Sequence, residues 1–475
     1  MITLREEITV ARSVQDCFRY IADFRTVAEW DATAVRAEKV SSGPVGVGSQ
    51  FDVDCQVGPS KLRLHYEITE FEPWASLVLI GRGRFFDVED TITFTETDAG
   101  THILYSAAFT YRWGLGRMEG LLEPGMRTMG SESLAGMKRA LEAIPPEPKI
   151  SACSERADRW VAPGVALFSK WGYRRSIAQR QPVSNFMDGQ HVLLTGASSG
   201  LGLASAIALA DAGADLTLVI RNPDKRDELL DAIAMETSRQ DIAIELADLS
   251  LISDVEDLSA RLIKKGKPID VLINNAGALF NEYALTSEGL EQSFSLLLLS
   301  PWRLTRNLHP LLARHDQPAR VVNVVSGGMY TEKLSCEGLI MTPDDYQGPR
   351  AYARAKRALT VLTELWAEEW ADDGIVVNAM HPGWADTPGV ASALPTFRAI
   401  TRTILRSSEE GADTIVWLAR ALEAGKVTGQ LFLDREPRTP YLLEKTRESL
   451  PERSKLETFL TGHLPLGPAH RTAAA

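Results

Sequence analysis

The feature that most constrains the fold is a glycine-rich turn between an apolar run and a helical pattern. The run HVLLT (191–195) suits a strand buried on both faces of a parallel sheet. The turn GASSGLG follows, with Gly196, Gly200 and Gly202, and it opens the helical pattern LASAIALADAG. Glycine permits positive φ and lets the backbone approach a pyrophosphate closely, while the helix N-terminus offers it N–H groups and partial positive charge. This order of elements predicts a dinucleotide-binding unit.

The rest of the second half alternates strand patterns with helix patterns. The strand patterns are DLTLVI (215–220), IAIEL (242–246) and DVLI (270–273). Parallel strands joined by crossover helices produce such an alternation. From Gln190 onward we therefore expect a doubly wound α/β Rossmann domain.

The end of the second strand pattern bears on the choice of nucleotide. An acidic residue at this place binds the ribose 2′-hydroxyl of NAD, but this chain has Arg221 there. A guanidinium suits a 2′-phosphate, which favours NADP(H) as the cofactor. The alternative is an ordinary surface arginine.

Five motifs follow one another along this half of the chain. They are TGASSGLG (195–202), NNAG (274–277), VVSGG (324–328), YARAK (352–356) and HPGWADT (381–387). In content and order they resemble the classical short-chain dehydrogenase/reductase family, over about residues 188–435. The long spacing between VVSGG and YARAK is similar to that of the retinol-dehydrogenase-like branch.

Two of these motifs contain the residues expected to perform chemistry. Tyr352 and Lys356 are four residues apart, so on a helix they share one face. A free phenol has a pKa near ~10, and a nearby ammonium would lower it into range for acid/base work. The resemblance implies that Lys356 also holds the nicotinamide ribose and that Ser326 hydrogen-bonds the substrate oxygen. Tyr352 would then exchange the proton while the nicotinamide exchanges the hydride, with no metal.

The resemblance also implies a set of cofactor-binding residues. Asp248 is expected near the adenine, and Pro382, Gly383 and Thr387 near the nicotinamide carboxamide. The full set is Thr195, Gly196, Ser198, Ser199, Gly200, Leu201, Gly202, Arg221, Asp248, Leu249, Asn275, Ala276, Gly277, Tyr352, Lys356, Pro382, Gly383 and Thr387.

One position departs from the family pattern. The family places an asparagine on the helix after NNAG, where this chain has Leu297. That asparagine supports a backbone distortion and a proton relay through water to the lysine, and leucine cannot form a hydrogen bond. Ser295 or a rearranged water is a candidate substitute. The other interpretations are slow turnover, or lost turnover with cofactor binding kept.

Residues 1–144 have a different character. Ser13 suits the N-cap of a short helix, after which strand patterns alternate between apolar and polar residues. A long helical pattern covers 117–143. This order resembles the START-like helix-grip superfamily of polyketide cyclases and lipid-transport proteins, which implies an α+β domain that binds an apolar ligand. Met126, Met129 and Met137 are candidates for lining its cavity, with plain core as the alternative.

A connector joins the two halves, and we place it at 145–188. It opens on the stiff run IPPEPKI (144–150). Its stretch 160–175 is aromatic and basic, as in segments that lie at a membrane interface. We favour the alternative that this stretch packs on the second domain. The third segment, 189–475, is the NADP-binding domain with a C-terminal tail.

Composition excludes several classes of protein. The net charge of −12 and the absence of a Lys/Arg run argue against nucleic-acid binding. No apolar stretch reaches the ~20 residues of a transmembrane helix, and the N-terminus has no secretory signal. The four scattered cysteines form no zinc pattern. We expect reduced thiols in a cytoplasmic protein.

Together these features predict a two-domain NADP(H)-dependent oxidoreductase. We expect it to act on the carbonyl or alcohol group of a hydrophobic substrate of lipid, steroid or polyketide type. The alternatives are a catalytically weak or inactive NADP(H)-binding regulator and a lipid carrier. Family members are often dimers or tetramers, so a homo-oligomer is compatible with the sequence.

Overall fold

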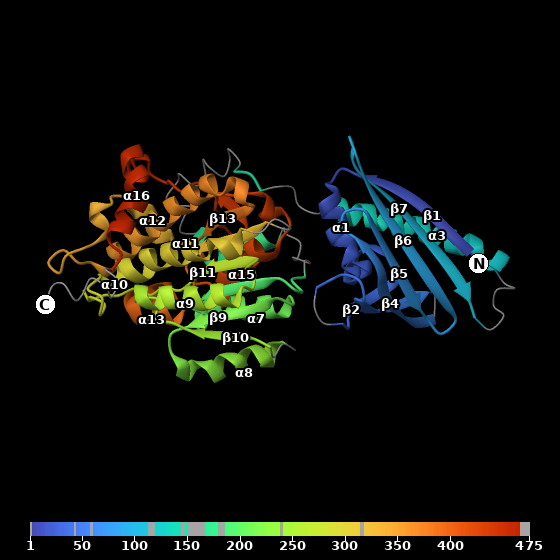
Figure 1. The fold of residues 1–475 in the computed structure, drawn as a ribbon, viewed down its shortest axis with the longest axis horizontal. Helices are drawn as coiled ribbons and strands as arrows, with labels where there is room; N and C mark the ends of the chain where they lie inside the picture. Colours follow the sequence, from blue (N-terminus) through green and yellow to red (C-terminus); the bar gives the residue numbers. More distant parts are fainter. Residues whose placement is uncertain are drawn as a thin grey trace. The chain divides into compact units, whose positions relative to one another are not determined.

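The structure is a computed structural model that describes residues 2–41, 44–57, 60–112, 119–143, 148–150, 167–178, 186–237, 241–313 and 318–465. The chain forms two compact units (Figure 1). The first comprises Met1–Pro146 with Ser184–Gly189, and the second comprises Glu147–Val183 with Gln190–Ala475. The return of Ser184–Gly189 to the first unit was not expected from the sequence. Asp188 forms an ion pair with Arg25 at 2.6 Å, which ties this segment to the first unit.

The first unit is built on an antiparallel sheet of seven strands in the order β1-β7-β6-β5-β4-β3-β2. Its core face alternates as the sequence predicts, because buried and less buried residues follow one another along β5 and β6. The strands are β1 (Ile2–Val10), β2 (Ala34–Lys39), β3 (Gln50–Val57), β4 (Ser60–Glu72), β5 (Ser76–Arg82), β6 (Phe86–Thr97) and β7 (Gly100–Tyr111).

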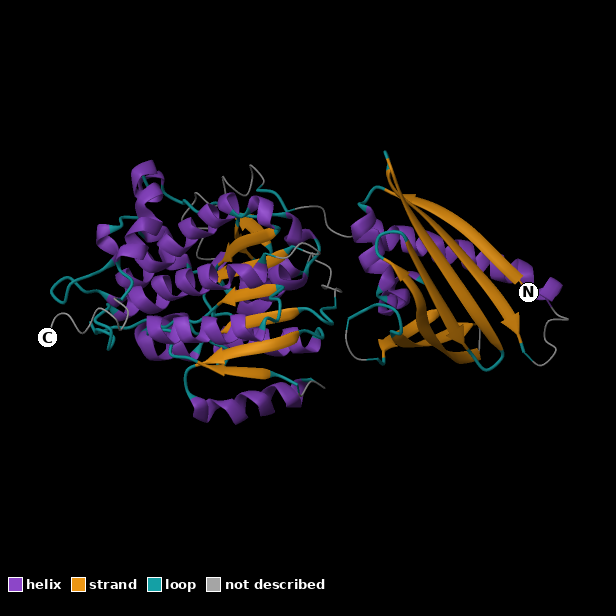
Figure 2. Cartoon of the chain, in the orientation of Figure 1, coloured by secondary structure: helices purple, strands orange, loops and turns teal. Residues whose placement is uncertain are grey.

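Helices cover one face of this sheet (Figure 2). They are α1 (Val14–Ala22), α2 (Val27–Trp30) and α3 (Glu119–Ala143), and the Ser13 hydroxyl caps α1 by accepting from the Asp16 N–H. Gly136 lets α3 approach α2 closely, because a Cβ there would lie 2.0 Å from the Trp30 carbonyl oxygen. Met137 is fully buried in this core. The predicted α+β helix-grip arrangement is confirmed.

The second unit contains a sheet of eight strands in the order β10-β9-β8-β11-β12-β13-β14-β15. All neighbours are parallel except β14 and β15. The strands are β8 (His191–Thr195), β9 (Asp215–Ile220), β10 (Ala243–Leu246), β11 (Val271–Asn274), β12 (Ala319–Val324), β13 (Ile375–Met380), β14 (Leu431–Leu433) and β15 (Glu436–Arg438).

Helices lie on both faces of this sheet (Figure 2), so the predicted doubly wound Rossmann domain is confirmed. The strand order reverses between β8 and β11, and ligands of such sheets bind at the carboxyl ends of the strands at this point. The helices are α6 (Lys170–Ile177), α7 (Gly200–Asp211), α8 (Arg226–Glu236), α9 (Ile252–Lys265), α10 (Gln292–Phe294), α11 (Ser300–Leu312), α12 (Gly348–Glu369), α13 (Pro388–Ala393), α14 (Pro395–Thr401), α15 (Ser408–Arg420) and α16 (Leu450–Gly462).

The connector enters the second unit before α6. The Lys170 N–H donates to the Ile404 carbonyl at 2.9 Å, whereas Trp171 is 62% exposed. The described part of the stretch 160–175 therefore packs on the second unit. Residues 160–166, and with them that part of the membrane-contact interpretation, lie outside the described residues.

Other sequence expectations concern cysteines, metals and membrane segments. Cys17, Cys55 and Cys336 are buried free thiols, and Cys153 lies outside the described residues. Within the described ranges, no cluster of three or more His, Cys, Asp or Glu side chains could hold a metal ion. Within the same ranges, no helix has both the length and the apolarity required to cross a membrane.

Candidate active site

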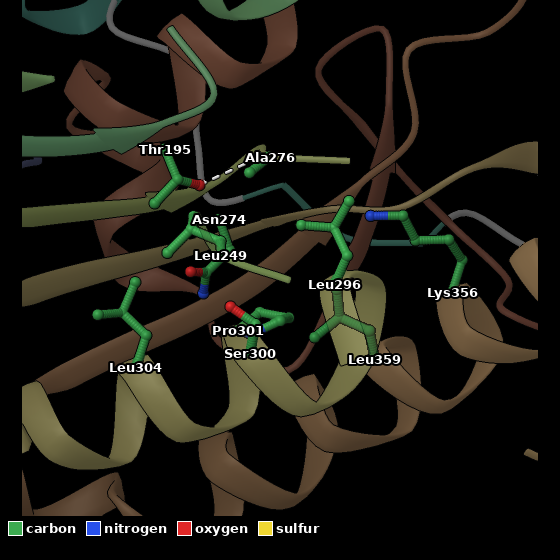
Figure 3. A pocket seen from close by; sticks show the side chains of 10 residues that line it. All are labelled: Thr195, Leu249, Asn274, Ala276, Leu296, Ser300, Pro301, Leu304, Lys356 and Leu359. Carbon is green, nitrogen blue, oxygen red and sulfur yellow. Dashed lines mark hydrogen bonds between the residues drawn. The ribbon is translucent and has the colours of Figure 1, made fainter. Parts of the chain in front are cut away.

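Two loops meet where β8 and β11 end, at the switch point of the parallel sheet. The Thr195 hydroxyl accepts hydrogen bonds from the N–H groups of Asn275 and Ala276, both at 3.0 Å. Figure 3 shows the bond from Ala276. The Asn275 amide nitrogen donates in return to the carbonyl oxygens of Thr195 at 2.9 Å and Gly196 at 3.1 Å. These polar groups of Thr195 and Asn275, which were predicted to bind cofactor, thus join the glycine turn to the NNAG loop. They hold the two loops together through hydrogen bonds to the protein's own backbone.

The glycines of the turn are required by close approaches of the backbone. Gly196 has φ +69°, and a Cβ there would lie 2.8 Å from Cα of Ala276. A Cβ on Gly202 would lie 2.0 Å from the Gly196 carbonyl oxygen. Gly200 has φ +54°, and a Cβ added there would lie 3.3 Å from Cβ of Thr387. The result is a backbone cradle at the N-terminus of α7, which suits the phosphates of a dinucleotide.

The adenosine end of the predicted site lies along the ends of β9 and β10. Arg221 follows β9 and is exposed to solvent. The Asp248 carboxylate accepts from the Ser250 N–H at 3.0 Å and the Ser250 hydroxyl at 2.8 Å, so it also orders its own loop. The side chain of Leu201 points towards α15, because its Cδ2 lies 2.6 Å from where a Cβ of Gly411 would be, so a contact with the cofactor would fall to its backbone N–H at the start of α7. Its side chain therefore packs on α15.

Several other predicted residues lie around the same cradle. Ser199 is the N-cap of α7, in an extended conformation, and Ser198 precedes it in the turn. Leu249, which is buried, and Ala276, which is partly buried, both line the cavity of Figure 3. Gly277 follows Ala276 and is exposed.

The three predicted catalytic residues come together at the carboxyl end of β12. Tyr352 and Lys356 are one turn apart on α12, and Ser326 follows β12. The Ser326 hydroxyl forms a hydrogen bond with the Tyr352 phenol. Lys356 Nζ lies 5.8 Å from the centroid of the Tyr352 ring and donates to the Val324 carbonyl at 2.8 Å. A hydroxyl, a phenol and an ammonium therefore share one site.

The charge states of these groups differ from the sequence-based expectation. Burial raises the pKa of Tyr352 to about 12, and the hydrogen bond from Ser326 offsets only part of that rise. Burial also lowers the pKa of Lys356 to about 8. The expected lowering of the phenol pKa by the ammonium is therefore wrong for this structure, because burial opposes both charged forms. At neutral pH the phenol keeps its proton and can donate it.

Leu297 stands in a π-helical turn, Ser295–Leu299, before α11. It is fully buried, and its Cδ2 lies 3.1 Å from where a Cβ of Gly277 would be. The distorted turn therefore persists without the asparagine of the family. The Ser295 hydroxyl donates to the Ser250 carbonyl at 2.7 Å, so its proton is already engaged and only its lone pairs remain for a relay.

A small cavity lies beside Lys356, and Figure 3 shows its lining. Its volume of about 10 Å³ is room for about one water molecule. The polar groups on its wall include Lys356, Asn274 and Ser300. Within the described part of the chain, Oδ1 of Asn274 is buried without a hydrogen-bond partner. The cavity thus offers a water molecule partners that do not depend on residue 297.

The loop predicted to meet the nicotinamide is held by a residue that the sequence did not single out. Arg406 donates to the Pro382 carbonyl at 3.2 Å. Gly383 has φ +70°, and a Cβ there would lie 2.6 Å from Cζ of Arg406 and 2.7 Å from the Phe168 carbonyl oxygen. Thr387 caps α13 by accepting from the Val390 N–H at 3.3 Å. Arg406 and Phe168 belong to no motif, and no spacing rule points to them.

Comparison with known proteins gives matches in both units. The family model of short chain dehydrogenases matches residues 190–396. The family model described as polyketide cyclase/dehydrase and lipid transport matches residues 1–142. The two matched ranges leave the connector between them.

Individual relatives extend this comparison. The human dehydrogenase/reductase SDR family member 12 is 36% identical over 305 residues, which cover 63% of this chain and 95% of the relative. Human retinol dehydrogenase 13 is 27% identical over 267 residues, which cover 54% of this chain and 80% of the relative. A solved short chain dehydrogenase/reductase family protein is 26% identical, with 52% of this chain and 95% of that chain covered and a TM-score of 0.42.

Proposed function

The chain belongs to the short-chain dehydrogenase/reductase family, and on this premise we propose that it is an NADP(H)-dependent oxidoreductase acting on the carbonyl or alcohol group of a hydrophobic substrate. The observation that carries the proposal is the meeting of Ser326, Tyr352 and Lys356 at the carboxyl end of β12. In the same sheet, the glycine cradle opens at the end of β8.

The residues of the cradle fit a dinucleotide, because Gly196 and Gly202 stand where a Cβ would collide with neighbouring backbone, and the tight turn that they allow brings backbone N–H groups to the N-terminus of α7. The N-terminus of α7 would hold the phosphates, Lys356 the nicotinamide ribose, and the loop of Pro382 and Gly383 the carboxamide. When bound, the nicotinamide supplies or accepts the hydride.

The chain's own residues would handle the proton and the orientation of the substrate. The Ser326 hydroxyl hydrogen-bonds the substrate oxygen and directs it towards the phenol. In reduction, Tyr352 donates its proton to that oxygen, and the high pKa of the phenol keeps the proton available at neutral pH. Lys356 can replenish that proton, because its lowered pKa of about 8 allows the ammonium to release one.

Arg221 supports the choice of NADP(H) over NAD(H), because its exposed guanidinium follows β9 where the ribose 2′-position is bound in such folds. We expect Arg221→Ala to weaken NADPH binding relative to NADH by about tenfold, since a charge-assisted contact to a phosphate is lost. Fluorescence titration with both nucleotides measures the ratio. Arg226→Ala, at another exposed arginine nearby, is the control. Tighter binding of NADH by the unchanged protein, with no effect of Arg221→Ala, would contradict the assignment.

Two observations support a hydrophobic substrate. The N-terminal unit matches a family that includes lipid-transport proteins. One relative is a retinol dehydrogenase, whose name gives an apolar alcohol as its substrate. We propose that the helix-grip unit binds an apolar ligand and that the reductase unit performs the chemistry.

The test is to incubate the full chain with NADPH and a panel of apolar aldehydes and ketones. Nucleotide binding is measured first, and oxidation of NADPH is then followed by absorbance. We expect binding of NADPH and substrate-dependent oxidation. The proposed activity would be rejected if the protein binds NADPH but no carbonyl causes its oxidation and, in the reverse direction, no alcohol causes reduction of NADP+.

Leu297 favours a second candidate, a weak or inactive NADP(H)-binding regulator or lipid carrier. If the proposed enzyme is correct, Leu297→Asn should change kcat by less than about tenfold, because Ser326, Tyr352 and Lys356 carry the direct chemistry. A gain of about 100-fold or more in single-turnover rate would instead show that the leucine cripples the site. Leu298→Asn, at the next buried position of the same turn, controls for the cost of burying an amide.

Other parts of the proposal concern the protein as a whole. We propose domains at 1–144 and 189–475 joined by the connector 145–188, and a cytoplasmic location. Native mass spectrometry of freshly purified protein would report the subunit count and any retained nucleotide or apolar ligand.

A further inference from the structure

The end of the connector lies against the catalytic loop of the reductase unit. The Phe168 ring comes within 3.5 Å of the position that a Cβ of Gly327 would take, and Gly327 directly follows Ser326. Phe168 is half-buried. A residue that precedes the whole Rossmann sheet in sequence is therefore a neighbour of the substrate-binding serine.

A buried guanidinium holds this residue in place. Arg406 donates to the carbonyl oxygens of Leu167 at 2.6 Å, Phe168 at 3.0 Å and Ser169 at 3.2 Å. The Trp384 N–H donates to the same Phe168 oxygen at 2.8 Å. Since Arg406 is 1% exposed, the backbone of this segment is fixed to the interior of the unit.

Phe168 belongs to an aromatic wall with Tyr330, His381 and Trp384, in which Tyr330 and His381 are buried and Phe168 and Trp384 are partly exposed. The Phe168 and Tyr330 rings are nearly parallel, with an interplanar angle of 8° and 6.4 Å between centroids. His381 meets the Phe168 ring edge-on at 5.0 Å, and Trp384 meets it at 6.0 Å. Burial lowers the pKa of His381 to about 3, so the wall is uncharged at neutral pH.

We propose that Phe168 is a specificity-determining residue of the reductase site, and that it selects flat, ring-containing apolar carbonyl compounds over straight chains. This inference rests on the proposed function and names its substrate class. A rigid aromatic face gains most from a flat partner, whereas a flexible chain loses rotamer freedom when it is ordered on the wall. The segment before the fold thereby contributes directly to substrate choice.

The experiment compares two methyl ketones of equal carbon number, 2-acetonaphthone and dodecan-2-one. We expect the wild-type protein to favour the naphthyl ketone, and Phe168→Leu to reduce the ratio of the two kcat/KM values by about tenfold. Phe168→Tyr keeps the ring and should keep the ratio. Trp171→Leu changes an aromatic residue of the same segment that is 62% exposed, and should leave the ratio unchanged.

Two further measurements separate the possible failures. The affinity for NADPH must be unchanged in Phe168→Leu. If the ratio of the two kcat/KM values is also unchanged in that variant, the inference is overturned while the enzyme activity stands. Equilibrium binding of 2-acetonaphthone to the protein loaded with NADP+ is measured by fluorescence. If wild-type protein turns over neither ketone but binds the naphthyl ketone in a Phe168-dependent way, the proposed activity fails, and with it the role of Phe168 in substrate choice, whereas its role as a contact for flat apolar ligands remains. If Phe168→Leu loses NADPH affinity together with activity on both ketones, Phe168 has a structural role and the specificity inference is rejected.

Discussion

Replacement of Tyr352 by phenylalanine is expected to lower kcat for carbonyl reduction by about 10²–10⁴-fold, the usual contribution of a positioned acid. The phenol is the group that hydrogen-bonds with Ser326, and at neutral pH it carries the proton that the substrate oxygen must receive. Phenylalanine keeps the ring and removes only the hydroxyl, so binding of NADPH should stay within about twofold. Stopped-flow oxidation of NADPH measures the rate, and a fluorescence titration measures the binding.

The matched control is Tyr346→Phe, which removes a hydroxyl that donates to the Phe280 carbonyl at 3.0 Å. It should retain most of the activity. Equal rates of NADPH oxidation in wild type and Tyr352→Phe would mean that another group supplies the proton. The proposed mechanism would then be wrong, although the family assignment would remain.

Sequence predicted the parts of this protein in which short-range spacing determines geometry. The glycine turn of β8 and α7 is one example, because Gly196 and Gly202 stand where the backbone has no room for a Cβ. The pairing of Tyr352 with Lys356 is another, since a separation of four residues puts both on one side of α12. The parallel sheet followed from the succession of apolar strand runs and helix patterns, and the helix-grip fold followed from the resemblance that the order of elements in residues 1–144 supports.

Other features depend on long-range contacts or on burial, which motifs do not encode. The clamp formed by the hydrogen bonds from Arg406 to the backbone of Phe168 joins residues 238 positions apart, and no sequence pattern in either segment predicts it. The pKa of Tyr352 rises because the partly buried phenol is poorly solvated, so its direction was predicted wrongly from the neighbouring lysine alone. The π-helical turn at Leu297 persists without the expected asparagine, which shows that packing can sustain a distortion that one polar residue was expected to support.

Replacement of Arg406 by leucine is expected to lower the free energy of unfolding of the reductase unit by about 3–5 kcal/mol. Arg406 donates to the Asp434 carboxylate at 2.9 Å, and the two side chains are 1% and 3% exposed. Leucine would leave that carboxylate buried without its guanidinium, and three connector carbonyls would lose a donor. Scanning calorimetry should show a fall of about 10 °C in the reductase transition.

A second variant distinguishes the buried charge from the lost packing. Asp434 has φ +53°, which asparagine also tolerates, so Asp434→Asn removes the charge without new strain. If the uncompensated charge is the main cost, Arg406→Leu combined with Asp434→Asn should recover much of the lost stability. Arg174→Leu breaks an ion pair to Glu410 in which the arginine is 65% exposed, and should cost less than about 1 kcal/mol. Because Arg406 also fixes the backbone of Phe168, the doubly substituted protein should regain stability and still discriminate poorly between the two ketones. If stability and discrimination both recover fully, the clamp does not position the aromatic wall.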